Sequence, residues 1–152
     1  CADSGMTARQ IAAALEEKKR DICLIAMLDT LEYLKRGGRI SATVAFAGGL
    51  LNIKPVVNIV DGVIHILGKA RGSRQGNNLL VQEISRAGGI DFSLPILLGY
   101  TGLTDALLKK YIADSAPLWK YGVDCLRCTT IGSVVGTHVG PGAIAAAFFR
   151  KS

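Results

Sequence analysis

The sequence predicts an α/β fold in which a mixed β-sheet carries helices packed against it. Short apolar runs of strand length alternate with segments of helical periodicity, and one β-hairpin motif adds an antiparallel pair. The 152 residues are 49% hydrophobic and 20% charged. That is enough apolar material for one compact core, and it excludes a disordered chain.

The first forty residues are predicted to form a helix, a strand and a second helix. Residues 7–19 have an amphipathic pattern and end in a basic run that complements the helix dipole. Residues 22–28 form a short apolar strand. Asp29 or Thr30 can cap the second helix, which two consecutive glycines must end after about residue 35.

Residues 42–51 have no polar face. The segment is too short to span a bilayer, for which roughly 20 apolar residues are needed, and no longer apolar run occurs elsewhere. It must therefore be covered on several sides, by the core, by a further domain or by an apolar ligand. We expect no integral membrane association.

A β-hairpin is predicted next. Residues 54–60 and 63–67 alternate apolar and polar side chains around Asp61-Gly62, a favoured two-residue turn. Residues 69–74 are expected to be a polar, basic link.

The same periodicities predict the elements of the rest of the chain. In order, they are a helix at 77–87, a strand at 94–100, a helix at 104–115, a strand at 123–129, a helical turn at 131–135, a glycine loop around His138 and a strand at 143–149.

The excess positive charge lies in one stretch of the chain. The formal net charge is +6, and residues 35–74 contain seven basic side chains against Asp61 alone, so this stretch accounts for all of it. An anionic ligand or partner is expected to meet the protein there. The alternative is a solvated basic face without a partner. Aromatic residues are only 6% and do not interleave with the charge, which argues against nucleic acid.

The four cysteines do not suggest a disulfide framework. Cys125 and Cys128 have the spacing of a metal knuckle or redox pair, but no second pair accompanies them, and positions three apart on a strand face opposite sides. We expect buried, reduced thiols, no metal, and a reducing, cytoplasmic compartment. The polar start without an initiating Met suggests a piece of a longer chain.

His138 is the strongest candidate for a functional side chain. It lies among glycines and a proline that allow positive φ and close approach to another group. Its ring, the Thr137 hydroxyl and neighbouring amides suit an anion. A general base, a metal ligand and a structural histidine are the alternatives. No Gly-x-Ser-x-Gly elbow accompanies the histidine, and the chain's other histidine, His65, has no acidic neighbours.

Several segments in order resemble one family over essentially the whole chain. They are residues 31–41, 51–56, 61–62, 69–72 and, most distinctive, the Gly-Thr-His-Val-Gly-Pro-Gly stretch within 131–143. Together they resemble the carboxyl-terminal half of DegV family proteins, the fatty-acid-binding subunits of bacterial fatty acid kinase.

The resemblance implies a two-domain protein with a long-chain fatty acid between its domains. Residues 1–28 would lead in from an amino-terminal domain that has no counterpart in this sequence, and residues 29–152 would form the carboxyl-terminal lipid-binding domain. His138 would hold the carboxylate, with Thr137 beside it and Arg39, which follows the two glycines, in the same region.

The same resemblance implies the remaining roles. Val44, Phe46 and Leu50 would line the acyl tunnel, and Lys69 and Arg71 would belong to the basic surface that meets a kinase. We therefore expect a binding protein that has no catalytic residues or cofactor. It would shield the acid and present it to a separate ATP-dependent fatty acid kinase. The alternatives are a small hydrolase or transferase with His138 as base, and a structural fragment without ligand.

Overall fold

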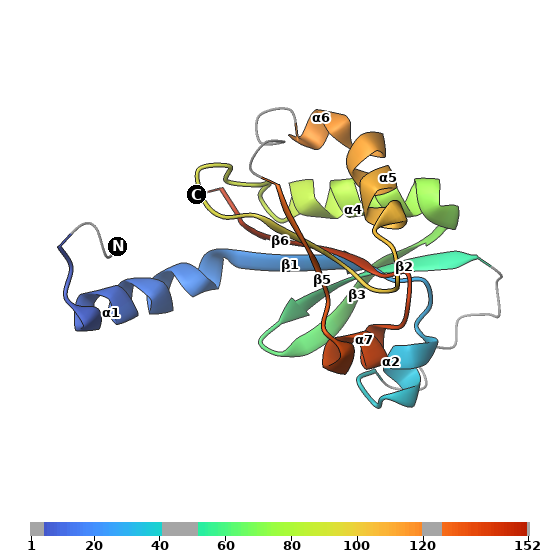
Figure 1. The fold of residues 1–152 in the computed structure, drawn as a ribbon, viewed down its shortest axis with the longest axis horizontal. Coiled ribbons are helices and arrows are strands. Elements are labelled where there is room, and N and C mark those ends of the chain that lie inside the picture. Colours follow the sequence, from blue (N-terminus) through green and yellow to red (C-terminus); the bar gives the residue numbers. More distant parts are fainter. Residues whose placement is uncertain (1–4, 41–51, 120–125, 152) are drawn as a thin grey trace.

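A computed structural model describes residues 5–40, 52–119 and 126–151 and contains a six-stranded sheet (Figure 1). The strands are β1 (Ile22–Met27), β2 (Ile53–Val60), β3 (Val63–Arg71), β4 (Leu97–Tyr100), β5 (Arg127–Thr130) and β6 (Ile144–Phe149). The helices are α1 (Ala8–Lys18), the short 3₁₀ turn η2 (Lys19–Asp21), α2 (Glu32–Arg36), α4 (Gly72–Arg86), α5 (Ala106–Asp114), α6 (Ala116–Trp119) and α7 (Ser133–Val139).

The sheet is mixed, as predicted. Its strand order is β3-β2-β1-β6-β4-β5, and neighbouring strands are antiparallel except for the parallel pair β4–β5. The strand predicted at residues 22–28 is β1, and it lies between β2 and β6 in the middle of the sheet. Residues 22–27 therefore belong to the same layer as the rest of the domain.

The two faces of the sheet are covered unequally. Helices α4, α5 and α6 lie over one face, and α2 and α7 lie on the other (Figure 1). Strand β6 shows the division: Ile144 and Phe148 are buried in the main core with residues of α4 and α5, whereas Ala145 and Ala147, which alternate with them, point to the opposite face.

Helix α1 is confirmed, together with its start. The Thr7 hydroxyl accepts a hydrogen bond from the Gln10 amide, and the Gln10 side chain accepts one from the Thr7 amide, which forms a capping box. No residue of α1 is buried, and the helix projects away from the sheet (Figure 1). Its apolar side, which includes Leu15, therefore has no cover from the part of the chain that the structure describes.

The hairpin is also confirmed. Asp61 and Gly62 both have positive φ, as a type I′ turn requires. The basic link expected at residues 69–74 is wrong, because β3 continues to Arg71 and α4 begins at Gly72. The continuation is possible because β2 already starts at Ile53, which pairs with Arg71.

The region around His138 differs more from the prediction. A helical turn at 131–135 followed by a glycine loop was expected, but α7 extends to Val139 and includes His138 in its last turn. The Thr137 hydroxyl donates to the Ser133 carbonyl at 2.8 Å within this helix. Positive φ begins only at Gly140, so the glycine loop is confined to the connection to β6.

Cys128 is exposed, so the expectation that it is a buried thiol is wrong. It lies on β5, an edge strand of the sheet, where one side lacks a neighbouring strand. Cys125 lies outside the described residues. Cys23 is partly buried, and neither Cys23 nor Cys128 forms a disulfide.

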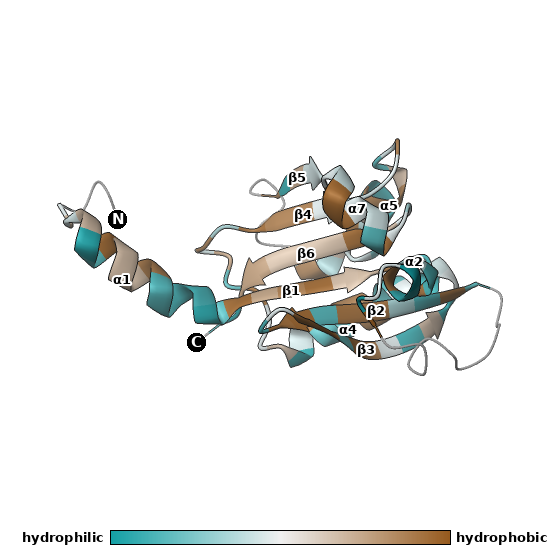
Figure 2. Ribbon diagram, turned by 90° about the horizontal axis from the view of Figure 1, so that it is seen from below, coloured by the Kyte–Doolittle hydropathy of each residue, from teal (hydrophilic) through white to brown (hydrophobic). Residues whose placement is uncertain are grey.

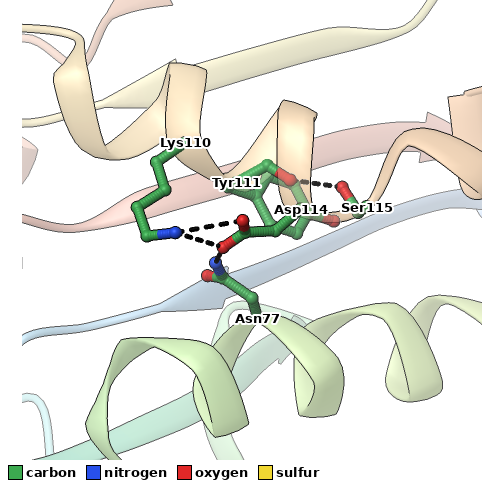
Figure 3. A network of polar contacts seen from close by, with 5 residues as sticks. All are labelled: Asn77, Lys110, Tyr111, Asp114 and Ser115. Carbon is green, nitrogen blue, oxygen red and sulfur yellow. Dashed lines mark hydrogen bonds and ion pairs between the residues drawn. The ribbon is translucent and has the colours of Figure 1, made fainter.

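A polar network joins α4 to α5 (Figure 3). The buried Asn77 side chain donates to the Asp114 carboxylate at 2.8 Å, and the Lys110 ammonium donates to both oxygens of the same carboxylate. One residue further along the chain, the Ser115 hydroxyl donates to the Tyr111 carbonyl. The hydrogen bonds from Lys110 and then Asn77 hold the pKa of Asp114 below its usual value.

This lowered pKa predicts a pH-dependent contribution to stability. A carboxylate whose pKa is lower when folded stabilises above its unfolded pKa, about 3.9, and the contribution is lost as pH falls through the folded pKa. In urea unfolding, wild type should be more stable than Asp114→Asn at pH 7, and the gap should close in acid. Glu17→Gln, on exposed α1, is the control. A gap that stays constant with pH would contradict the prediction.

Candidate functional site

An apolar hollow lies on the sheet face opposite α4, and we call it the trough. Figure 2 looks onto this face, where hydrophobic strands run between and beyond α2 and α7. The trough encloses about 210 Å³. Its floor is made of two rows across the central strands, Ala26–Ala145–Gly99 and Leu24–Ala147–Leu97.

Small side chains create the trough. The alanines at positions 26, 145 and 147 leave volume above the sheet that leucine or phenylalanine would fill, while Ile131 packs over Gly99. Val135 and Val139 of α7 and Leu34 of α2 cover one end of it. Apolar surface left in water costs roughly 25 cal/mol per Å², so a continuous apolar hollow of this kind indicates a binding surface.

His138 lies where α7 packs on α2. A Cβ added to Gly37 would overlap the His138 ring, so only glycine permits this contact. Nδ1 of the ring is buried and has no hydrogen-bond partner. Buried polar atoms are nearly always paired, which makes this nitrogen a candidate for a ligand contact. Gly140 permits a similar approach, because a Cβ there would overlap the Tyr33 ring.

A second hollow surrounds this histidine. Its lining includes Tyr33, Gly37, Thr137, His138 and Pro141, and it encloses about 370 Å³. We call it the head pocket. The two hollows share the helices α2 and α7: Tyr33 and His138 line the head pocket, and the residues that follow them, Leu34 and Val139, line the trough. Together they suit a ligand with a long apolar body and one polar end.

The predicted polar residues are only partly brought together. His138 and Thr137 both line the head pocket, but the Thr137 hydroxyl proton is engaged by Ser133, so this oxygen is left to accept. The Arg39 guanidinium is exposed and donates to the Gly37 carbonyl at 2.7 Å. In this conformation, the Arg39 side chain does not line the head pocket.

Val44, Phe46 and Leu50, the predicted acyl-chain contacts, lie outside the described residues. Sequence reasoning missed Arg36 and Tyr33 of the head pocket and the alanines of the trough. The alanines had a detectable signal, since every second residue from Ala143 to Ala147 is alanine. Arg36 had none, because an arginine in a short amphipathic helix more often only solvates its surface.

Lys69 and Arg71 are exposed on β3, an edge strand. Between them, Ala70 is buried, and a Cβ on Gly68 would meet Leu79 of α4. Alternation along the strand therefore places Lys69 and Arg71 on the same sheet face as the trough.

Within residues 5–40, 52–119 and 126–151, no three His, Cys, Asp or Glu side chains come together as a metal site would require. Over the same residues, no helix has the length and apolar character needed to cross a bilayer.

Fold and site define an α/β protein with an apolar trough on one sheet face and a second hollow, which contains His138 and Arg36, between α2 and α7. The chain belongs to the DegV family: residues 1–151 match the model of a family described as uncharacterised DegV proteins. It is 33% identical to a DegV domain-containing protein of Clostridium perfringens over 95% of this chain and 49% of that one.

Solved structures share the fold. A fatty acid binding DegV family protein of Streptococcus agalactiae is 26% identical, with a TM-score of 0.77 over 100% of this chain and 53% of that one. The fatty acid kinase B3 protein of Streptococcus pneumoniae, loaded with linoleic acid, has a TM-score of 0.83 at 18% identity over 99% and 52%. The chain spans about half the length of these relatives.

The contact between Gly37 and His138 can be tested by Gly37→Ala. Gly37 has a φ of −77°, which alanine adopts freely, so any effect comes from the overlap with the ring. We expect a loss of about 1–3 kcal/mol in the free energy of unfolding and shifted NMR signals of the His138 ring.

Gly132→Ala is the matched control for this substitution. Gly132 precedes the same helix α7, and an added Cβ there meets nothing within 4 Å. It should cost less than about 1 kcal/mol and leave the ring signals in place. Equal effects of the two substitutions would disprove the close contact.

Proposed function

We propose that this protein binds a long-chain fatty acid, with the acyl chain in the trough and the carboxylate at the head pocket. The observation that carries the proposal is the apolar floor on the face opposite α4, covered by helices at one end only. Each methylene removed from water contributes about 0.8 kcal/mol, so ten or more supply tight binding with little polar contact. Fatty acid binding by the Streptococcus agalactiae family member supports this assignment.

The carboxylate is proposed to lie against His138. Its unpaired, buried ring nitrogen can bond an anionic oxygen after a modest movement of α2 or of the ring itself. Arg39 at the end of α2 is proposed to contribute its guanidinium once it releases the Gly37 carbonyl, and Thr137 to line the pocket. Val44, Phe46 and Leu50 are proposed to complete the acyl site.

The protein is further proposed to act as a binding subunit that presents the acid to a separate ATP-dependent fatty acid kinase. The fold similarity to the kinase B3 protein agrees with this role. Lys69 and Arg71 are proposed as part of the kinase-facing surface, because they are exposed and lie on the trough side of an edge strand. The expected cytoplasmic location belongs to the same proposal.

The other half of the site is proposed to come from an amino-terminal domain, from which residues 1–28 lead into this one. The relatives are about twice as long as this chain, and α1 has an uncovered apolar side. A hydrolytic role for His138 has no comparable support: among the described residues, no carboxylate or nucleophile is hydrogen-bonded to its ring.

The fatty acid assignment predicts the effect of His138→Ala. Organic extraction and mass spectrometry of the protein, expressed at its full native length, should detect long-chain fatty acid in wild type. Loss of a hydrogen bond to a charged oxygen should weaken binding roughly 10- to 100-fold and lower acyl-phosphate formation with the kinase. The variant should still unfold in one cooperative thermal transition, so the loss of binding is not a loss of fold.

His65→Ala is the matched control, since His65 is exposed on β3. It should bind like wild type. If wild type carries no fatty acid, the fatty acid assignment is wrong. If His138→Ala binds as tightly as wild type, His138 does not hold the carboxylate.

The partner surface predicts a different defect for Arg71→Glu. Charge reversal should leave the fatty acid content unchanged and reduce kinase turnover at least several-fold, with a stronger effect at low salt. Arg20→Glu, an exposed reversal after α1, should have no such effect. If Arg71→Glu and Arg20→Glu give the same kinase turnover, Lys69 and Arg71 do not face the kinase.

A further inference from the structure

The floor of the trough changes abruptly along β6. The residues that face the trough side are every second one: Ala143, Ala145, Ala147 and then Phe149. The three alanines line the trough and Phe149 does not. A floor of methyl groups is therefore followed, at the next position, by an aromatic ring.

The neighbouring strands repeat this gradient. The register extends the positions into rows which, counted away from α2 and α7, are Ala26–Ala145–Gly99, then Leu24–Ala147–Leu97, then Ile22–Phe149. Side-chain volume grows from row to row. Beside Leu97 on β5 the register places Arg127, an exposed cation that a hydrocarbon tail avoids.

We propose that Phe149 is the stop that sets the acyl chain length, and that Ala147 is the last floor position over which the chain passes. This inference rests on the fatty acid binding proposed above. His138 and the head pocket lie at the α2–α7 end, so the tail of a bound acid runs toward Phe149. Phe149 meets that tail with Ile22 beside it on β1.

The dimensions agree with a long-chain acid. From Ala143 to Phe149 the strand advances six residues, about 20 Å, which is close to the length of an extended sixteen-carbon chain. One row corresponds to two residues, about 6.6 Å, or roughly five methylenes. Moving the stop by one row should change the preferred length by up to that amount.

Two opposite substitutions test the proposal in the protein expressed at its full native length. Phe149→Ala removes the stop, and Ala147→Phe places a ring one row closer to the head pocket. Affinities are measured for saturated acids in two-carbon steps from lauric to behenic acid. The optimum should move to longer acids in Phe149→Ala and to shorter ones in Ala147→Phe. Each methylene forced out of the trough should cost about fourfold in affinity.

Ala113→Phe, on the exposed side of α5, controls for adding a ring elsewhere and should keep the wild-type profile. Ala147→Leu gives a smaller shift in the same direction and replaces Ala147→Phe if thermal unfolding shows that variant to be unfolded. If the variants bind fatty acid with an unchanged optimum, Phe149 is not the stop, although the fatty acid assignment stands. If wild type binds none of the acids, the assignment fails and the stop fails with it.

Discussion

A strand in the middle of a sheet has to remove two faces from water, and in this protein only one of them is fully covered. On β6, Ile144 and Phe148 reach the core under α4 and α5, while Ala145 and Ala147 face the side where α2 and α7 cover one end. The trough follows from this unequal coverage, and the head pocket lies between the two helices that cover one end of this face.

The two short helices on the open side have a second role, because they bring the polar groups to one end of an apolar surface. Gly37 lets α7 approach α2 closely enough for the His138 ring to lie on its backbone. The resulting pocket is polar at a single point, while the floor beyond it carries almost no hydrogen-bonding groups. Such polarity matches an amphiphile with one charged end, which is bound by burial along its length and oriented by its head.

Sequence reasoning succeeded where the signal is local. The hairpin at Asp61-Gly62 and the capped helix after Thr7 depend on neighbouring residues, and both are confirmed. It failed at α7, because glycines there suggested a loop although the segment needs flexibility only after Val139. The trough was missed for another reason: its rows exist only once β6 lies between β1 and β4, which are distant in the chain.

By itself, then, the sequence determined the mixed α/β class, the position of the hairpin and the glycine turn that follows His138, since these depend on periodicity and on residues close in the chain. Tertiary structure alone decided which face of the sheet stays uncovered, that small side chains from three strands form one floor, and that the histidine packs on Gly37. Those features arise from strand register and helix packing between distant segments, which no local pattern encodes.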